Sequence, residues 1–416
     1  MNWARNLEYS ATTLHEPTSI DELCDIVAGA ASLRALGSRH SFNTIADTRA
    51  AQVSVARIPV DLQIDASAGT VTVGAGARYG EFVEELDRAG WAIHNLASLP
   101  HISVGGAIAT GTHGSGDGNG SLASAVAALE IVTADGTLVT LRRGDADFAG
   151  AVVSLGALGI VTRVTLDIGP SFQVRQDVFE MLPWHTLAAN YDTITSSAYS
   201  VSLFTHWGDE GITQAWLKSR MDAAGPAAYS APDFFGAVPA TVARHPLPDV
   251  AADHTTLQLG EVGPWWDRLA HFQLGFTPSN GLELQSEYLV PRRNVLGAIE
   301  AIRALGPRIQ PLLLVGELRT IAGDGLWLSP SHDEDCVGFH FTWKQHIPEV
   351  EALLPAIDDA FAPFGARPHW GKVFDTDAAR LNAAYPRLGE FRELAERMDP
   401  AGKFRNDFVN RWVFGS

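Results

Sequence analysis

The chain has 416 residues, which is longer than one hydrophobic core normally supports, so two or more packed units are expected. Hydrophobic residues make up 46% of the composition and charged residues 19%, a balance typical of a globular enzyme and not of a disordered chain. The net charge of -18 argues against a nucleic-acid partner and against an anionic membrane surface, because both require a concentrated positive surface.

The first part of the chain is predicted to alternate short strands with helices. Apolar residues recur at helical spacing over residues 19–31, behind residues of the capping type. A short apolar strand at 33–36 leads into a loop of glycine and serine at 37–41. A strand at 70–74 and a helix at 79–89 follow. This βαβ-like opening lacks the Gly-x-Gly-x-x-Gly dinucleotide fingerprint.

A long segment at residues 98–120 is rich in glycine, serine and threonine, a composition that lets the backbone approach a ligand closely. Strands are predicted after it at 126–133 and 137–141, and residues 156–161 open a further strand. Beyond Gly169 the sequence changes to longer alternating strands, which are separated by loops rich in proline and tryptophan. We therefore predict a domain boundary there.

The second part is predicted to form one antiparallel sheet with helices on one face, which makes an α+β domain. Its strands are expected at 199–205, 211–218, 281–289, 311–321 and 336–343. Helical patterns at 294–305 and 350–361 would cover one face of the sheet. The end of the chain is expected to be helical and then irregular, and to fold back on the first domain. The predicted division is 1–169, 170–374 and 375–416.

Two glycine-rich stretches predict a bound cofactor. The loop at 37–41 exposes consecutive backbone N–H groups that can hold a pyrophosphate, and its His40 could approach the bound group. The stretch at 98–116 has five glycines with interleaved hydroxyls, and its apolar side chains could lie against an isoalloxazine ring. The alternatives are a surface histidine in a turn and a flexible linker. The apolar side chains between the glycines disfavour the linker.

Polar residues alternate along two of the predicted strands. Period-2 alternation places Glu317 and Arg319 on one face of their strand, and His340 and Thr342 on one face of the next. The alternative for either strand is a solvated face, with an exposed ion pair worth roughly 0–1 kcal/mol. Lys372, taken alone, fits a plain surface lysine.

The two glycine-rich stretches together resemble the vanillyl-alcohol oxidase type of flavoprotein, in which an N-terminal domain binds FAD and a histidine of the first loop carries it covalently. Residues 367–372 and 399–404 look like the aldonolactone and alditol oxidase branch. Residues 97–104, 316–320 and 340–343 look most like the alditol oxidases within that branch. The resemblance runs through the whole chain. It implies an α+β, two-domain FAD-binding fold with an antiparallel-sheet substrate domain.

Carried over to this sequence, the resemblance implies that FAD is attached covalently through His40 and that neither cysteine forms a second bond to it. The implied FAD contacts are Gly37, Ser38, Arg39, His40, Ser41, Ser103, Gly105, Gly111, Thr112, His113, Gly114, Ser115, Val161 and His369. Gly105 falls where related proteins bring a small residue near the flavin carbon that reacts with oxygen. The implied polyol site consists of Ser103, Glu317, Arg319, His340, Thr342 and Lys372, with Glu317, Arg319 and Lys372 as the catalytic residues.

The activity implied by the resemblance is that of an oxidase. FAD would take a hydride from the primary carbinol of an alditol such as xylitol or sorbitol, and O2 would be reduced to hydrogen peroxide as an aldose forms. Two alternatives stay open. One is an aldonolactone oxidase or dehydrogenase of the same fold, and the other is a flavin or sugar binder without turnover.

Other residue types give little sign of further chemistry. Cys24 and Cys336 lie far apart, which suggests free thiols and neither a disulfide framework nor a thiolate metal site. The histidines His245, His254 and His271 have no metal-ligand spacing and are interpreted as loop packing, so no metal is expected. The chain shows no secretory signal at its N-terminus and no membrane span. We expect a cytoplasmic protein, and no oligomeric state is predicted.

Overall fold

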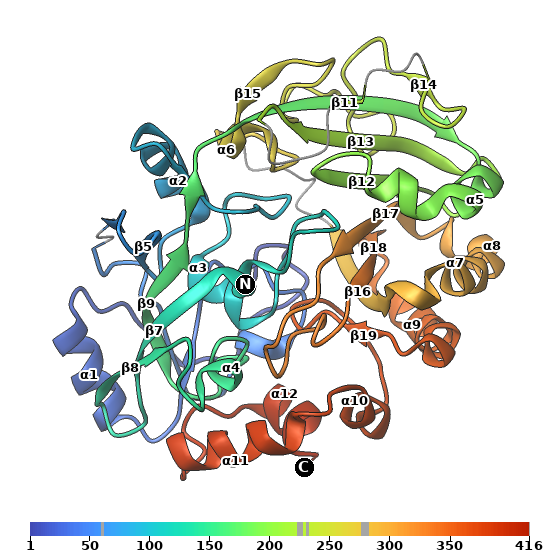
Figure 1. Ribbon diagram of the computed structural model, residues 1–416. Helices are drawn as coiled ribbons and strands as arrows, with labels where there is room; N and C mark the ends of the chain where they lie inside the picture. The colour runs from blue at the N-terminus through green and yellow to red at the C-terminus, as the bar shows by residue number, and fades with distance from the viewer. Residues whose placement is uncertain (60–61, 223–227, 230–232, 276–282, 416) are drawn as a thin grey trace.

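The structure is a computed structural model that describes residues 1–59, 62–222, 228–229, 233–275 and 283–415. Two antiparallel sheets of five and nine strands form its framework, and helices line their outer sides (Figure 1). A small parallel sheet has the order β1-β3-β2, and its Leu33 and Val53 share a buried cluster with Val132 and Ile160 of the five-stranded sheet. Its elements are β1 (Thr13–His15), β3 (Ala51–Val53), β2 (Leu33–Ala35) and helix α1 (Ile20–Gly29). The predicted N-terminus of α1 is confirmed, because the Ser19 side chain accepts a hydrogen bond from the Glu22 N–H.

The first half of the chain builds the five-stranded sheet in the order β4-β5-β9-β7-β8. These strands are β4 (Gln63–Asp65), β5 (Thr70–Gly74), β9 (Ile160–Asp167), β7 (Val126–Val132) and β8 (Leu138–Arg142). The sheet is accompanied by α2 (Tyr79–Arg88), α3 (Val104–Ala109), α4 (Phe148–Ala151) and the short strand pair β6 (Trp91–Ala92) and β10 (Gly169–Pro170). Helix α3 was not predicted, since its first turn contains two glycines, which disfavour helix.

The nine-stranded sheet runs in the order β14-β11-β13-β12-β17-β18-β16-β19, with β15 also paired to β11. Its strands are β11 (Gln173–Leu182), β12 (Ser200–Thr205), β13 (Ile212–Arg220), β14 (Val238–Pro239), β15 (Val262–Pro264), β16 (Glu283–Pro291), β17 (Leu313–Ile321), β18 (Cys336–Lys344) and β19 (Arg367–Pro368). All five predicted strands are present and antiparallel; residues 281–282 of one prediction lie outside the described residues.

Helices cover one face of the nine-stranded sheet, as predicted. They are α5 (Trp184–Thr195), α7 (Val295–Ala304), α8 (Gly306–Ile309) and α9 (Ile347–Phe361), while α6 (Trp265–Arg268) follows β15. Ile299 of α7 and Ile357 of α9 share a buried core with Phe339, Phe341 and Trp343 of β18. The opposite face of β18 is therefore left for the polar residues of the same strand.

The C-terminal segment returns to the first half of the chain (Figure 1). It contains α10 (Ala378–Ala384), α11 (Leu388–Met398) and α12 (Asp407–Val409). Phe391 of α11 and Phe408 of α12 belong to the same buried core as Val73 and Phe82. The prediction of an irregular end is wrong, because residues 407–414 are helical. Among the described residues, no helix is long and apolar enough to cross a membrane.

Candidate active site

A cavity of about 580 Å³ joins the two halves of the molecule. Loop segments of the first half line one end of it, chiefly residues 34–42, 53–56, 75–78 and 154–161 together with the start of α3. Polar side chains of β16, β17 and β18 line the other end. The cavity therefore places the predicted cofactor loops opposite the predicted polar strand faces.

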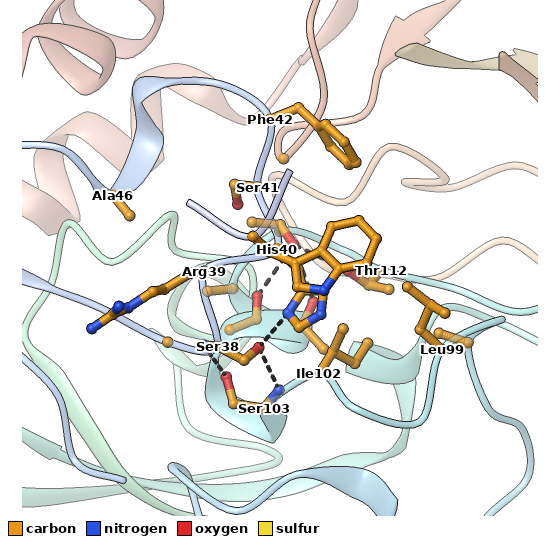
Figure 2. Close-up of a pocket in the computed structure, with 18 of the residues that line it drawn as sticks. Ser38, Arg39, His40, Ser41, Phe42, Ala46, Leu99, Ile102, Ser103 and Thr112 are labelled. Carbon is orange, nitrogen blue, oxygen red and sulfur yellow. Dashed lines mark hydrogen bonds between the residues drawn. The ribbon is translucent and has the colours of Figure 1, made fainter. Parts of the chain in front are cut away.

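The loop that carries His40 is tied to the N-terminal end of α3. Ser103 N donates to Ser38 Oγ at 2.9 Å, and Ser38 N donates to Ser103 Oγ at 3.2 Å. The same Ser38 Oγ lies 3.1 Å from His40 Nδ1, so one hydroxyl orients the imidazole and joins the two glycine-rich stretches (Figure 2). Arg39 has a φ of 66°, a left-handed conformation that is uncommon outside glycine and turns the chain sharply before His40.

His40 is held as a neutral, partly covered imidazole. The Trp3 ring stacks on it with centroids 5.1 Å apart, and Trp3 N donates to Arg39 O at 2.8 Å. Burial, with smaller contributions from His101 and Arg78, lowers the pKa of His40 to about 4. A neutral imidazole keeps a free lone pair near neutral pH, which is what a nucleophile needs.

The first-half end of the cavity fits a flavin dinucleotide. The backbone N–H groups of Arg39, His40 and Ser41 meet no acceptor within the part of the chain that the structure describes, so they are free to hold phosphate oxygens. A Cβ at Gly37 would lie 2.8 Å from Ser103 Oγ, so the close approach of the two stretches requires glycine. Apolar side chains, Val161 among them, supply walls for a flat ring.

The polar end is built by three neighbouring strands in register. Glu287 of β16, His340 of β18 and Glu317 of β17 stand directly opposite one another across the sheet. We call them the acid–histidine row. Glu317 is 5% exposed and Arg319 is 6% exposed. The predicted shared face is confirmed, and the solvated-face alternative is wrong.

Glu287 lies at the centre of this polar end. Its carboxylate accepts a hydrogen bond from Arg319 Nη2 at 2.7 Å and lies 3.0 Å from Lys372 Nζ. His113 Nε2 and His340 Nδ1 lie 3.3 and 3.4 Å from its two oxygens. Burial alone would raise the pKa of Glu287, but Lys372 and Arg319 outweigh burial and hold that pKa well below its usual range. Glu287 is therefore the anion that balances both cations.

Sequence reasoning missed Glu287, although a signal was present. Glu283, Gln285 and Glu287 alternate along a predicted strand, in the same period-2 pattern that identified Glu317 and Arg319. All three line the cavity.

Lys372 is also bound to uncharged partners at the polar end. Its Nζ donates to Gln285 Oε1 at 2.9 Å and to His340 Nδ1 at 2.7 Å. Burial and the Lys372 charge lower the pKa of His340 to about 4, so its Nδ1 accepts while its Nε2 donates to Thr342 Oγ1 at 3.0 Å. Lys372 is thus a cavity residue, and the surface-lysine alternative is wrong.

Glu317 has a partner that sequence reasoning discounted. His271 Nε2 donates to Glu317 Oε1 at 2.9 Å, and Arg319 Nε lies 3.6 Å from Glu317 Oε2. Burial would raise the pKa of Glu317, but Arg319 and His271 together hold it below its usual range. The interpretation of His271 as loop packing is wrong, because it reaches the cavity from the segment after α6.

Most of the predicted cofactor residues line the cavity. Those that do are Gly37, Ser38, Arg39, His40, Ser41, Ser103, Gly105, Thr112, His113, Val161 and His369. Gly111, Gly114 and Ser115 do not, since they pack behind His113 against protein: Gly111 faces Pro330, Gly114 faces Asn95, and Ser115 Oγ donates to Val201 O. Sequence alone could not separate the lining residues of this segment from those behind it.

Two of these lining residues, His113 and His369, lie where the two halves of the molecule meet. The His113 and His369 rings are 6.0 Å apart, and His369 Nδ1 accepts a hydrogen bond from Gly371 N at 3.1 Å. Burial holds the pKa of His369 well below its usual range, so this ring is neutral. Among the described residues, no group of histidine, cysteine and carboxylate side chains could hold a metal ion.

The segments that build the two ends of the cavity each match a known protein family. Residues 12–142 match the model of an FAD binding domain, and residues 282–412 match that of D-arabinono-1,4-lactone oxidase. An alditol oxidase from Streptomyces sp. (strain IKD472 / FERM P-14339) is 48% identical over 100% of this chain and 99% of its own length. An L-gulono-1,4-lactone dehydrogenase from Mycobacterium tuberculosis is 27% identical, over 99% of this chain and 98% of its own.

The fold also matches solved structures. A crystal structure of cholesterol oxidase from B. sterolicum superposes with a TM-score of 0.77 over 99% of this chain and 96% of that chain. Their sequences are 16% identical, so this similarity concerns the fold alone.

Proposed function

The chain belongs to the alditol oxidase family, whose FAD-binding fold is of the vanillyl-alcohol oxidase type, and from this we propose that it oxidises the primary alcohol of an alditol to an aldose. The electron acceptor in this proposal is O2, which is reduced to hydrogen peroxide. The observation that carries the proposal is the charged lining of the polar end: Glu317, Arg319 and Lys372 all line the cavity wall opposite the cofactor loops. Such a wall offers both acceptors and donors to the hydroxyls of a substrate.

A polyol suits this end of the cavity because it has neither charge nor a large apolar body. Only a dense set of matched hydrogen bonds can hold one of its carbons in place. Glu317 can accept a hydrogen bond from the reacting hydroxyl, while Arg319 and Lys372 stabilise negative charge that develops on its oxygen. Ser103 and Thr342 supply hydroxyls for the remaining part of the chain. Each bond to a charged group contributes roughly 1.5–3 kcal/mol.

FAD, when bound, supplies the acceptor for the hydride that leaves the carbinol carbon. The free N–H groups of residues 39–41 would hold its phosphates, and the walls around Gly105 and Val161 would hold its ring. A Cβ on Gly105 would lie 3.1 Å from Ala75 Cβ, so this wall is already close-packed. His113 and His369 would border the ring, and the neutral His369 would add no charge there.

We also propose that FAD is attached covalently through His40, and His40→Ala is expected to release it. The support is the neutral imidazole at the cavity wall and its orientation by Ser38. Acid precipitation of the parent protein should leave the yellow colour in the pellet, whereas the His40→Ala pellet should be colourless. Ser38→Ala, which keeps the imidazole, should lower the attached fraction only partly. Yellow supernatant from the parent protein would contradict the attachment.

The substrate class is tested by anaerobic reduction of the flavin. Xylitol and sorbitol should bleach the flavin much faster than ethanol or 1-pentanol, because simple alkanols leave the buried polar groups unpaired. We expect the rate of flavin reduction to differ about 10- to 1000-fold, which corresponds to ~1–4 kcal/mol. In air, one hydrogen peroxide should appear per alcohol oxidised. A faster reaction with an aldonolactone would assign the chain to the lactone branch, and a flavin that no polyol or lactone reduces would indicate a binder.

We further propose that residues 1–169 and 375–416 make up the FAD-binding domain and residues 170–374 the substrate domain. The support is the shared core of the five-stranded sheet and the C-terminal helices, which is distinct from the core behind the nine-stranded sheet. For the cell compartment we propose the cytoplasm. Cys24 and Cys336 are free thiols, the state that a reducing compartment maintains.

A further inference from the structure

A buried chain of polar side chains runs behind the polar end of the cavity, from β13 to Glu317. Lys218 Nζ lies 3.2 Å from His271 Nδ1, and His271 Nε2 lies 2.9 Å from Glu317 Oε1. Lys218 is 1% exposed and His271 is 6% exposed. We propose that Lys218 and His271 are positioning residues for the reaction. Lys218 selects the tautomer of His271, and His271 then donates a hydrogen bond to one oxygen of Glu317, so that the other oxygen faces the substrate. This rests on the proposed function of Glu317.

The three acceptors around Lys218 define its role as a donor. Besides His271 Nδ1, its Nζ donates to Leu269 O at 2.6 Å and to Ala270 O at 2.8 Å. Of the two forms of a lysine side chain, only the ammonium has three protons to donate. Burial lowers the pKa of Lys218 well below its usual range, Arg268 and Arg319 act in the same direction, and Glu317 opposes them. The three acceptors within hydrogen-bond distance favour the ammonium form. The ammonium form satisfies this geometry and leaves His271 Nδ1 as an acceptor.

The tautomer of His271 follows from that bond. Burial lowers the pKa of His271 to about 4, and Lys218 lowers it in the same direction, so the ring carries one proton near neutral pH. Because Nδ1 accepts from Lys218, the proton is on Nε2 and points to Glu317 Oε1. Glu317 Oε2 is then the oxygen left for the substrate hydroxyl beside Arg319.

The ring itself is fixed independently of Lys218. His271 N donates to Ser98 O at 3.1 Å, and Thr256 N donates to His271 O at 2.9 Å. The ring edge packs against Phe204 and Trp216, with centroids 5.7 and 5.3 Å away. The position of the imidazole is therefore set by backbone and packing, and the choice of tautomer is left to Lys218.

Lys218→Met is the decisive variant, because it keeps the length of the side chain and removes its protons. Without Lys218 the neutral ring can carry its proton on Nδ1, where it donates a hydrogen bond to a backbone carbonyl, and Nε2 then faces Glu317 without a proton. Xylitol should then reduce the flavin about tenfold more slowly, or slower still, at pH 8. Lys344→Met, at the far end of β18, is the matched control, and xylitol should reduce its flavin at the parent rate.

The pH profile separates this role from a merely structural one. The charged and titratable groups facing His271 are Lys218, Glu317 and Arg319, with Arg268 and His340 next to them. Since Lys218 lowers the pKa of His271, its loss should raise that pKa. A protonated His271 carries a proton on both ring nitrogens and therefore donates from Nε2 to Glu317. Flavin reduction in Lys218→Met should therefore become faster as the pH falls from about 8 to 5, whereas the parent protein should show no such recovery.

His271 variants test the same chain with Lys218 in place. Glutamine can mimic the donor and acceptor of the neutral ring, so His271→Gln should retain most of the rate and show no new titration, whereas His271→Leu should lose it. Imidazole nitrogen NMR of the resting holoenzyme, assigned against His271→Gln, should show His271 protonated on Nε2.

These measurements have clear contrary outcomes. A parent-like rate and pH profile in Lys218→Met, equal rates in the two His271 variants, or a proton on Nδ1 would each overturn the proposal. The NMR measurement needs no substrate, so it tests the chain even if xylitol fails to reduce the parent protein, a result that would instead contradict the proposed function. If Lys218→Met does not fold, the His271 pair and the NMR spectrum decide.

Discussion

Replacing Arg319 by alanine should slow reduction of the flavin by xylitol about 100- to 1000-fold, the usual cost of removing one preorganised donor to a developing negative charge. Arg319 is buried between two carboxylates: its Nη2 lies 2.7 Å from Glu287 Oε1 and its Nε lies 3.6 Å from Glu317 Oε2. The loss removes that donor and leaves both carboxylates without their shared cation. Anaerobic stopped-flow reduction over a range of xylitol concentrations measures the limiting rate and the affinity separately.

Two further variants define what the Arg319 result means. Arg319→Lys keeps the charge but loses the planar fork, so it should recover only part of the rate. Arg175→Ala is the control: it removes a partly exposed arginine that pairs with Asp177 on β11, and xylitol should reduce its flavin at the parent rate. Retention of FAD in all three variants would show that the cofactor end is intact. An Arg319→Ala rate within about threefold of the parent would return Arg319 to a structural role.

Glu287→Gln is expected to damage both activity and stability. The substitution keeps the shape of the side chain but removes the carboxylate that pairs with Lys372 and the nearer of the two carboxylates that pair with Arg319. Breaking a buried pair typically costs about 3–5 kcal/mol. We expect a lower midpoint of thermal unfolding and flavin reduction slowed by about two orders of magnitude or more. Thermal scans followed by flavin absorbance and the same stopped-flow measurement test these two effects separately.

The pH dependence of Glu287→Gln gives a second test of the role of Glu287. Burial lowers the pKa of Lys372 and Glu287 raises it, so the Glu287→Gln change should lower the pKa of Lys372 further. Lys372 then loses its proton at a lower pH, and the remaining activity of the variant should increase as pH falls. An unchanged pH profile would contradict the assignment of Glu287 as the balancing anion.

Gly338→Ala provides an independent test, because it alters Glu287 without changing any charge. A Cβ at Gly338 would lie 2.9 Å from Glu287 Oε1 and 3.3 Å from His113 Cε1. The carboxylate would have to move away from Arg319, so reduction should slow in the same direction as in Glu287→Gln. The pH profile should move less, since the charge on Glu287 remains.

The sequence was informative where a side-chain pattern has a fixed spatial meaning. Alternation in a strand places Glu317 with Arg319, and His340 with Thr342, whatever the rest of the fold does. The loop around His40 was identified by glycine and serine, whose backbone freedom is local. For these residues the prediction needed only near neighbours in the chain.

Residues that depend on distant pairing were harder to predict. His271 reaches Glu317 from a loop segment without periodicity, and its place depends on bonds to Ser98 and Thr256. Lys218 stands near the end of a predicted strand, where a lysine ordinarily faces solvent. Gly111, Gly114 and Ser115 lie behind the cavity because of packing against segments far along the chain, such as Pro330 and Val201. None of these contacts has a local signature.

The acid–histidine row has a neighbour on the same sheet face, one pleat further along. Gln285, Thr342 and Val315 stand opposite one another there, on the same three strands. Replacing Val315 alters the cavity wall and leaves the strand ladder and the flavin loops as they are, whereas changes at Gln285 or Thr342 also remove a partner of Lys372 or His340. A duplicated gene could therefore drift toward longer, shorter or cyclic substrates one row at a time without first losing its cofactor, and a directed-evolution library could follow the same route.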